Sequence, residues 1–234
     1  MNLPEQSLWW LNRSTGLVLL VMFTIVVILG IFATQKAAGR RLPTFVPNQL
    51  HRSISVFAIA LLAAHILTSV LDSFVEIDWI DVVVPFVSPY RPFWLGLGTL
   101  AFDLTVAVLV TTWVKSRISE RAWHQVHLLS YAAWLLAVVH GLGTGTDSKN
   151  PWVVCTYLIC VLSVAIALAA RITWTQELSN VTRTLLIIGV AVVPIALAWW
   201  ALLGPLAPGW SAKAGTPSAS SQPSQELIGG RALV

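Results

Sequence analysis

Six long apolar stretches limit what this chain can fold into. Of its 234 residues, 56% are hydrophobic and only 10% are charged, well under half the charged share of soluble domains. One helical membrane span needs about 20 predominantly apolar residues. We therefore predict an all-α, polytopic membrane bundle of six transmembrane helices. The expected spans are 15–34, 50–71, 92–114, 122–142, 151–170 and 184–203.

The segments outside these spans are short or polar. Residues 1–14 precede the membrane domain, which we expect to cover residues 15–203. Residues 204–234 are rich in Pro, Ser, Ala and Gly, a composition that predicts a disordered tail. Residues 72–91 mix acidic and apolar side chains, as expected of a segment at the membrane interface.

Basic residues are divided unequally between the two sides of this bundle. One side carries nine of them: Lys36, Arg40, Arg41, Arg52, Lys115, Arg117, Arg121, Arg171 and Arg183. The other carries five: Arg13, Arg91, Lys149, Lys213 and Arg231. By the positive-inside rule, the loops after the first, third and fifth spans are cytoplasmic and both termini are outside. The net charge of +4 is explained by this loop bias and does not indicate nucleic-acid binding.

All histidines lie in or beside two of the spans. His51 and His65 are 14 residues apart, and His127 and His140 are 13 apart, so each pair is separated by roughly 20 Å along its helix. Ionisable groups at membrane depth usually mark a function, and imidazole is a common ligand of haem iron. Because both spans run in the same direction, His51 should lie level with His127, and His65 with His140. This arrangement predicts two bis-imidazole sites stacked across the bilayer.

The fourth span leaves one question open. A spacing of 13 residues turns His140 roughly 140° away from His127 on an ideal helix. The helix is then tightened or bent, or His127 lies in an irregular first turn. His124 could replace His127 as the ligand, although its spacing of 16 from His140 fits no better.

Charged side chains near the histidines are candidates to hold haem propionates, which favour Arg, Lys or Tyr. On the inner side they are Arg52, Arg40, Arg41 and Arg121, and on the outer side Arg13, Tyr90 and Arg91. Each of these charges can equally be one that sets the membrane topology. Asp103, within the third span, could pair with Arg13, orient a ligand histidine or join two helices.

The positions of the glycines and the absence of certain motifs limit which cofactor this chain can hold. The glycines at 96–98, 141–145 and Gly16 permit close approach of a porphyrin or of another helix. The sequence contains no C-x-x-C-H motif, so a haem would be of type b and held by imidazoles alone. It contains no dinucleotide-binding G-x-G-x-x-G motif after a strand and no P-loop. Any flavin is therefore expected on a partner protein.

These features resemble the ferric reductase-like transmembrane domain family. That family includes the membrane domains of NADPH oxidases and ferric reductases, and the haem-binding membrane subunit of the bacterial periplasmic methionine sulfoxide reductase system. The resemblance is carried by H-x13-H in one span and H-x12-H two spans later, and more weakly by YRPFWLGLGTLAFDL, RAWHQVHLLSYAAW and HGLGTGTD. It covers about residues 10–170.

The resemblance implies two b haems that pass electrons across a bacterial plasma membrane, with His51 paired to His127 and His65 to His140. The chain would be an electron-transfer component of an oxidoreductase. Its donor would be a separate flavoprotein or a quinol, and its acceptor a molecule or partner oxidoreductase at the outer face. Two alternatives stay open: a proton-coupled transporter with a histidine relay and no haem, and a scaffold subunit whose histidines are satisfied core groups.

Overall fold

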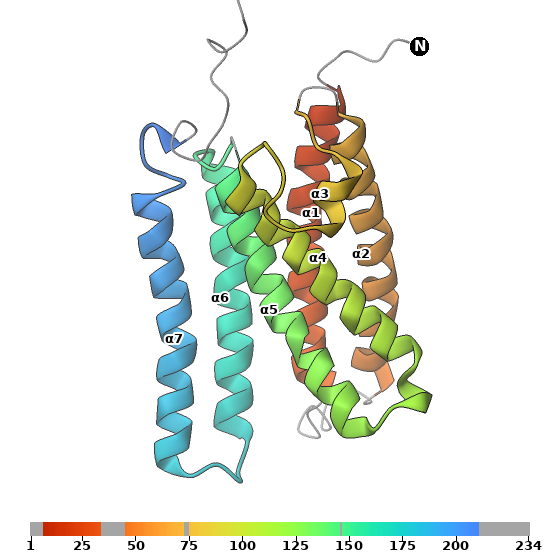
Figure 1. The fold of residues 1–234 in the computed structure, drawn as a ribbon. Coiled ribbons are helices and arrows are strands. Elements are labelled where there is room, and N and C mark those ends of the chain that lie inside the picture. The colour runs from red at the N-terminus through yellow and green to blue at the C-terminus, as the bar shows by residue number, and fades with distance from the viewer. Residues whose placement is uncertain (1–6, 34–44, 73–74, 146, 211–234) are drawn as a thin grey trace, which may run out of the picture.

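The computed structural model describes residues 7–33, 45–72, 75–145 and 147–210. These residues form seven α-helices and one 3-10 helix, and no strand occurs among them (Figure 1). The elements are α1 Ser7–Ala33, α2 Phe45–Leu71, α3 Trp79–Val83, α4 Pro92–Trp113, η2 Lys115–Arg117, α5 Glu120–Thr144, α6 Pro151–Trp174 and α7 Asn180–Leu203.

Six of the helices are long and apolar enough to cross a membrane, namely α1, α2, α4, α5, α6 and α7. Their spans of 22 to 27 residues correspond to about 33–40 Å, which exceeds a hydrocarbon core of about 30 Å. The predicted all-α architecture with six candidate spans is confirmed.

The helix ends differ from the predicted ones where capping extends a helix into polar sequence. The α5 helix begins at Glu120 because the Ser119 side chain accepts a hydrogen bond from the Ala122 backbone. Helix α1 begins at Ser7 and so includes half of the segment predicted to precede the bundle. The predicted tail starts with described turns at 204–210, and residues 211–234 lie outside the described part of the chain.

The helices alternate in direction, so the described chain begins and ends at the same end of the bundle (Figure 1). We call this the upper end, as it is drawn, and the opposite end the lower end. Helix α1 is central and packs against α2, α5 and α6, while α7 packs on the outside of α6. Trp134 of α5 donates a hydrogen bond to Thr24 of α1 over 3.0 Å within the apolar core that these helices share with α6.

A short cap closes the upper end of α4. The Thr99 hydroxyl donates to the backbone carbonyl of Asp81 in α3 over 2.7 Å, and the wholly buried Arg91 donates to the Gly143 carbonyl over 3.0 Å. Phe86 has φ 70°, and its backbone and ring lie where a side chain at Gly96 would be. The cap therefore depends on the glycine at position 96.

Candidate functional site

The two helix pairs α1–α2 and α4–α5 enclose a large cavity. Helix α2 packs along α1, and within the described residues no extended packing joins α2 to α4 or α5. The space between the two pairs is a cavity of about 1070 Å³. This volume is slightly above the usual range for ligand sites, about 300–1,000 Å³. All the histidines of the chain line it: His51, His65, His124, His127 and His140.

Three of these histidines are fixed by the same kind of hydrogen bond. In each, the ring Nδ1 contacts a main-chain carbonyl of the neighbouring helix. The distances are 2.9 Å from His51 to Val26, 3.1 Å from His65 to Asn12 and 2.8 Å from His140 to Trp94. A carbonyl only accepts hydrogen bonds, so Nδ1 must donate and carry the proton. A neutral ring then has its lone pair on Nε2, the state in which histidine binds a metal.

A glycine lies four residues after each of these carbonyls. A Cβ atom at Gly30 would be 3.3 Å from His51 Cε1, one at Gly16 3.2 Å from His65 Cε1, and one at Gly98 2.5 Å from His140 Cε1. Each imidazole therefore rests on a bare stretch of helix backbone. We call this combination of a helix carbonyl and a glycine four residues later a glycine dock.

Sequence reasoning noticed Gly16 and Gly98 but missed Gly30 and all three carbonyls. A signal for the docks was present in the sequence. Gly16 and Gly30 are 14 residues apart, as are His51 and His65 on the antiparallel partner helix. Equal spacing on two antiparallel helices brings each histidine to its own glycine.

The lower pair has the separation that one metal ion requires. The ring centroids of His51 and His127 are 6.2 Å apart. Two imidazoles bound on opposite sides of one metal ion, each by a bond of about 2 Å, have centroids roughly 6 Å apart. His124 is exposed, and only His127 has a described ring contact with His51. Helix α5 is continuous from Glu120, so His127 does not lie in an irregular first turn.

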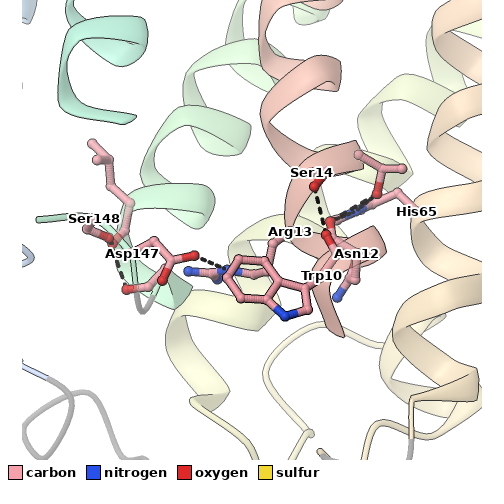
Figure 2. A network of polar contacts seen from close by, with 10 residues as sticks. Trp10, Asn12, Arg13, Ser14, His65, Asp147 and Ser148 are labelled. Atoms are coloured by element: carbon pink, nitrogen blue, oxygen red, sulfur yellow. Dashed lines mark hydrogen bonds and ion pairs between the residues drawn. The ribbon is translucent and has the colours of Figure 1, made fainter. Parts of the chain in front are cut away.

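The upper pair is held by a polar network at the start of α1. His65 and His140 both line the cavity, near the upper ends of α2 and α5. Figure 2 shows His65 bonded to the Asn12 carbonyl and, beside it, Arg13 paired with Asp147 at 3.3 Å. The same Asn12 accepts from Ser69 of α2 through its side chain, at 2.9 Å. The network joins α1 to α2 and to the loop after α5.

Of the six arginines predicted to hold propionates, the structure describes four, and these four differ in their position relative to the cavity. Arg13 and Arg52 line the cavity, as does Tyr90. Arg91 is buried away from it, and Arg121 is exposed at the lower end and does not line it. Burial lowers the pKa of the Arg91 guanidinium, which stays protonated at neutral pH. Arg40 and Arg41 lie outside the described residues.

Asp103 takes neither of the first two roles suggested for it, the ion pair with Arg13 and the orientation of a ligand histidine. Arg13 forms its ion pair with Asp147, and three histidines use main-chain carbonyls for their Nδ1 atoms. Asp103 does not line the cavity. Hydrogen bonds from Nδ1 to backbone carbonyls therefore orient these histidines, a role that the sequence suggested for a carboxylate.

The two pairs of histidines suit a prosthetic group in which most ligands of the metal ion belong to the group itself. No three His, Cys, Asp or Glu side chains gather as a metal site within the described ranges. A haem iron in a porphyrin needs only two protein ligands, and each histidine pair offers two imidazoles at one level of the bundle. The residues present thus fit haem b, whose iron and ring would occupy the space between the helix pairs.

A family model matches residues 7–147, more than half of the chain, and the chain belongs to this family, a domain of unknown function (DUF8596). No curated protein and no solved structure matches the chain.

Proposed function

We propose that this member of a family of unknown function is a membrane b-type dihaem protein that transfers electrons across the membrane. The single observation that carries the proposal is the set of glycine docks. Three imidazoles along one cavity have Nδ1 bound to backbone, which leaves Nε2 of each to face a ligand. A glycine dock restricts the sequence, because each ring needs a glycine at its point of contact. A histidine that only fills the core and satisfies its hydrogen bonds does not need such a glycine.

Each pair of histidines would hold one haem, His51 with His127 in the lower site and His65 with His140 in the upper site. When bound, the haem would supply an iron that cycles between two oxidation states. The chain's own part is to hold the imidazoles, exclude water and place cations near the propionates. Arg52 is suited to the lower site, and Arg13, with Tyr90, to the upper site.

The charge bias of the loops supports one orientation of the bundle, and with it the proposed direction of electron transfer. The lower end carries Lys115, Arg117 and Arg121, which supports a cytoplasmic position for that end. Electrons would enter there from a flavoprotein, with flavin as its cofactor, or from a quinol. They would leave at the upper end to an outer-face acceptor or partner oxidoreductase. Membrane lipid would surround the bundle, and nucleic acid has no part in this reaction.

A histidine proton relay is less well supported by the same contacts. A relay passes a proton in at one ring nitrogen and out at the other. In His51, His65 and His140, Nδ1 is engaged with a carbonyl that cannot supply a proton. Asp103, a carboxylate within a span, lies away from the cavity.

The test is an oxidised and dithionite-reduced absorbance spectrum of the detergent-purified protein, with haem counted per chain. We expect two low-spin b haems. His65→Ala and His140→Ala should each lose the upper haem only, whereas His124→Ala should keep both. A protein without haem, made in cells with ample haem, would refute the proposal and favour the transporter. For orientation, Lys149→Cys should react with an impermeant thiol reagent from outside the cell, and Arg117→Cys should not.

A further inference from the structure

His127 differs from the three docked histidines. Its Nδ1 atom is buried, yet within the described residues nothing forms a hydrogen bond with it. Its ring stacks on Trp123 instead, with centroids 5.0 Å apart and planes at 26°. Stacking on an aromatic face does not select which nitrogen carries the proton. His127 is therefore oriented by packing alone.

Helix α4, which docks His140, runs antiparallel to α5, so the position that would dock His127 is expected 13 or 14 residues after Gly98. On α1 the two docking glycines, Gly16 and Gly30, are 14 residues apart. On α4 the residue 14 positions after Gly98 is Thr112, which lines the cavity. The carbonyl four residues before Thr112 belongs to Val108. It accepts hydroxyl hydrogen bonds from both Thr112 at 2.7 Å and Thr111 at 3.1 Å. The place of a second dock on α4 thus holds side-chain bulk and an occupied carbonyl.

We infer that His51 anchors the lower haem and that His127 is an exchangeable ligand, so that a small neutral ligand can take its place on that side of the iron. The inference rests on the proposed function. Carbon monoxide and imidazole represent the class of ligand. Loss of the hydrogen-bond partner of a metal-bound histidine typically weakens metal binding about 10–100-fold, and His127 lacks such a partner from the outset.

The two sites differ in how firmly their rings are held. At the upper site both rings are docked through Nδ1, whereas at the lower site only His51 is. Arg52 and His124, which line the lower part of the cavity, are exposed. A ligand added from solution should therefore replace a histidine at one haem of the two.

The experiment compares two alanine variants of the full-length protein. In His127→Ala, both haems should stay bound, with one changed to a high-spin spectrum that added imidazole returns to low spin. In His51→Ala, the lower haem should be lost, and an unchanged spectrum of the upper haem shows that the chain still folds. In the unaltered protein, carbon monoxide should bind to about half of the reduced haem.

A second variant tests the reason for the exchange. Thr111→Val with Thr112→Gly frees the Val108 carbonyl and supplies the missing glycine. Imidazole or carbon monoxide binding at the lower haem should then weaken about 10–100-fold. Unchanged binding in this double variant would overturn the inference.

The other outcomes separate the two proposals. If His127→Ala loses a haem while His51→Ala keeps two, or if carbon monoxide binds neither haem or both, the inference is wrong although the proposed function stands. If the unaltered protein contains no haem, the proposed function fails, and this inference fails with it.

Discussion

Replacing Gly98 with alanine tests the closest glycine dock. The new Cβ would lie 2.5 Å from Cε1 and Nδ1 of His140, so the ring must retreat by about 1 Å to reach ordinary contact. That movement stretches the 2.8 Å bond from Nδ1 to the Trp94 carbonyl beyond hydrogen-bonding range. The variant should therefore damage both packing and the orientation of the imidazole.

The expected cost can be estimated from these two losses. Overpacking a tight contact costs about 1–3 kcal/mol, and the lost hydrogen bond about 1 kcal/mol. Replacing glycine with alanine inside a helix returns about 1 kcal/mol. The net loss in the free energy of unfolding should be about 1–3 kcal/mol. If haem is bound as proposed, its affinity at the upper site should also fall about 10–100-fold.

The assay is detergent-induced unfolding of the purified protein, with haem content measured on the same samples. Gly189→Ala is the matched control, because a Cβ atom at Gly189 in α7 meets nothing within 4 Å. Gly30→Ala is the intermediate case, since its Cβ would be 3.3 Å from His51 Cε1 and the ring needs to move only slightly. The reasoning would be refuted if Gly98→Ala were as stable, and held as much haem, as Gly189→Ala.

Substitutions at three other contacts have defined expectations in the same unfolding assay. Trp134→Phe removes the buried hydrogen bond to Thr24 and should cost about 1–3 kcal/mol, with Thr24→Val adding less in the double variant than it costs alone. Arg13→Gln and Asp147→Asn should each cost at most about 1 kcal/mol, because the pair is 23% and 38% exposed; a larger coupling in the double-mutant cycle would contradict a solvent-screened pair. Arg91→Met should cost about 2–4 kcal/mol, since it removes a buried charged donor from a carbonyl in α5, and a neutral result would show that the cap does not depend on it.

Much of the architecture follows from local sequence patterns. The six spans could be predicted because a bilayer requires each one to be a long apolar helix, a property read from about 20 neighbouring residues at a time. The level of each histidine could be predicted in the same way, since rise per residue is constant along a helix. The adjacency of His51 and His127 follows from those two facts and the shared direction of α2 and α5.

The hydrogen-bond and ion-pair partners of the polar side chains could not be predicted from local sequence patterns. Asp103 looked suited to orient a histidine because it is a carboxylate within a span, yet the orienting groups are carbonyls, which every residue has. Likewise, the predicted topology puts Arg91 on the side of the upper histidines and Arg121 on the side of the lower ones, but Arg91 is used by the cap and Arg121 is exposed. A side chain's partner depends on which neighbouring helix faces it.

The amino-acid sequence alone determines hydropathy, helix length and the intervals between the histidines. These properties do not depend on how the helices pack. The docks are a property of pairs of helices. Gly16 and Gly30 acquire their role only when α1 lies antiparallel to α2 with His65 and His51 at the same levels. Thr112 takes part in the lower site only because α5 brings Trp123, on which His127 stacks, within 3.4 Å of its hydroxyl. Close approach of two backbones depends on their register and crossing, which are set by packing over the whole bundle. For that reason tertiary structure alone distinguishes three firmly held imidazoles from the fourth.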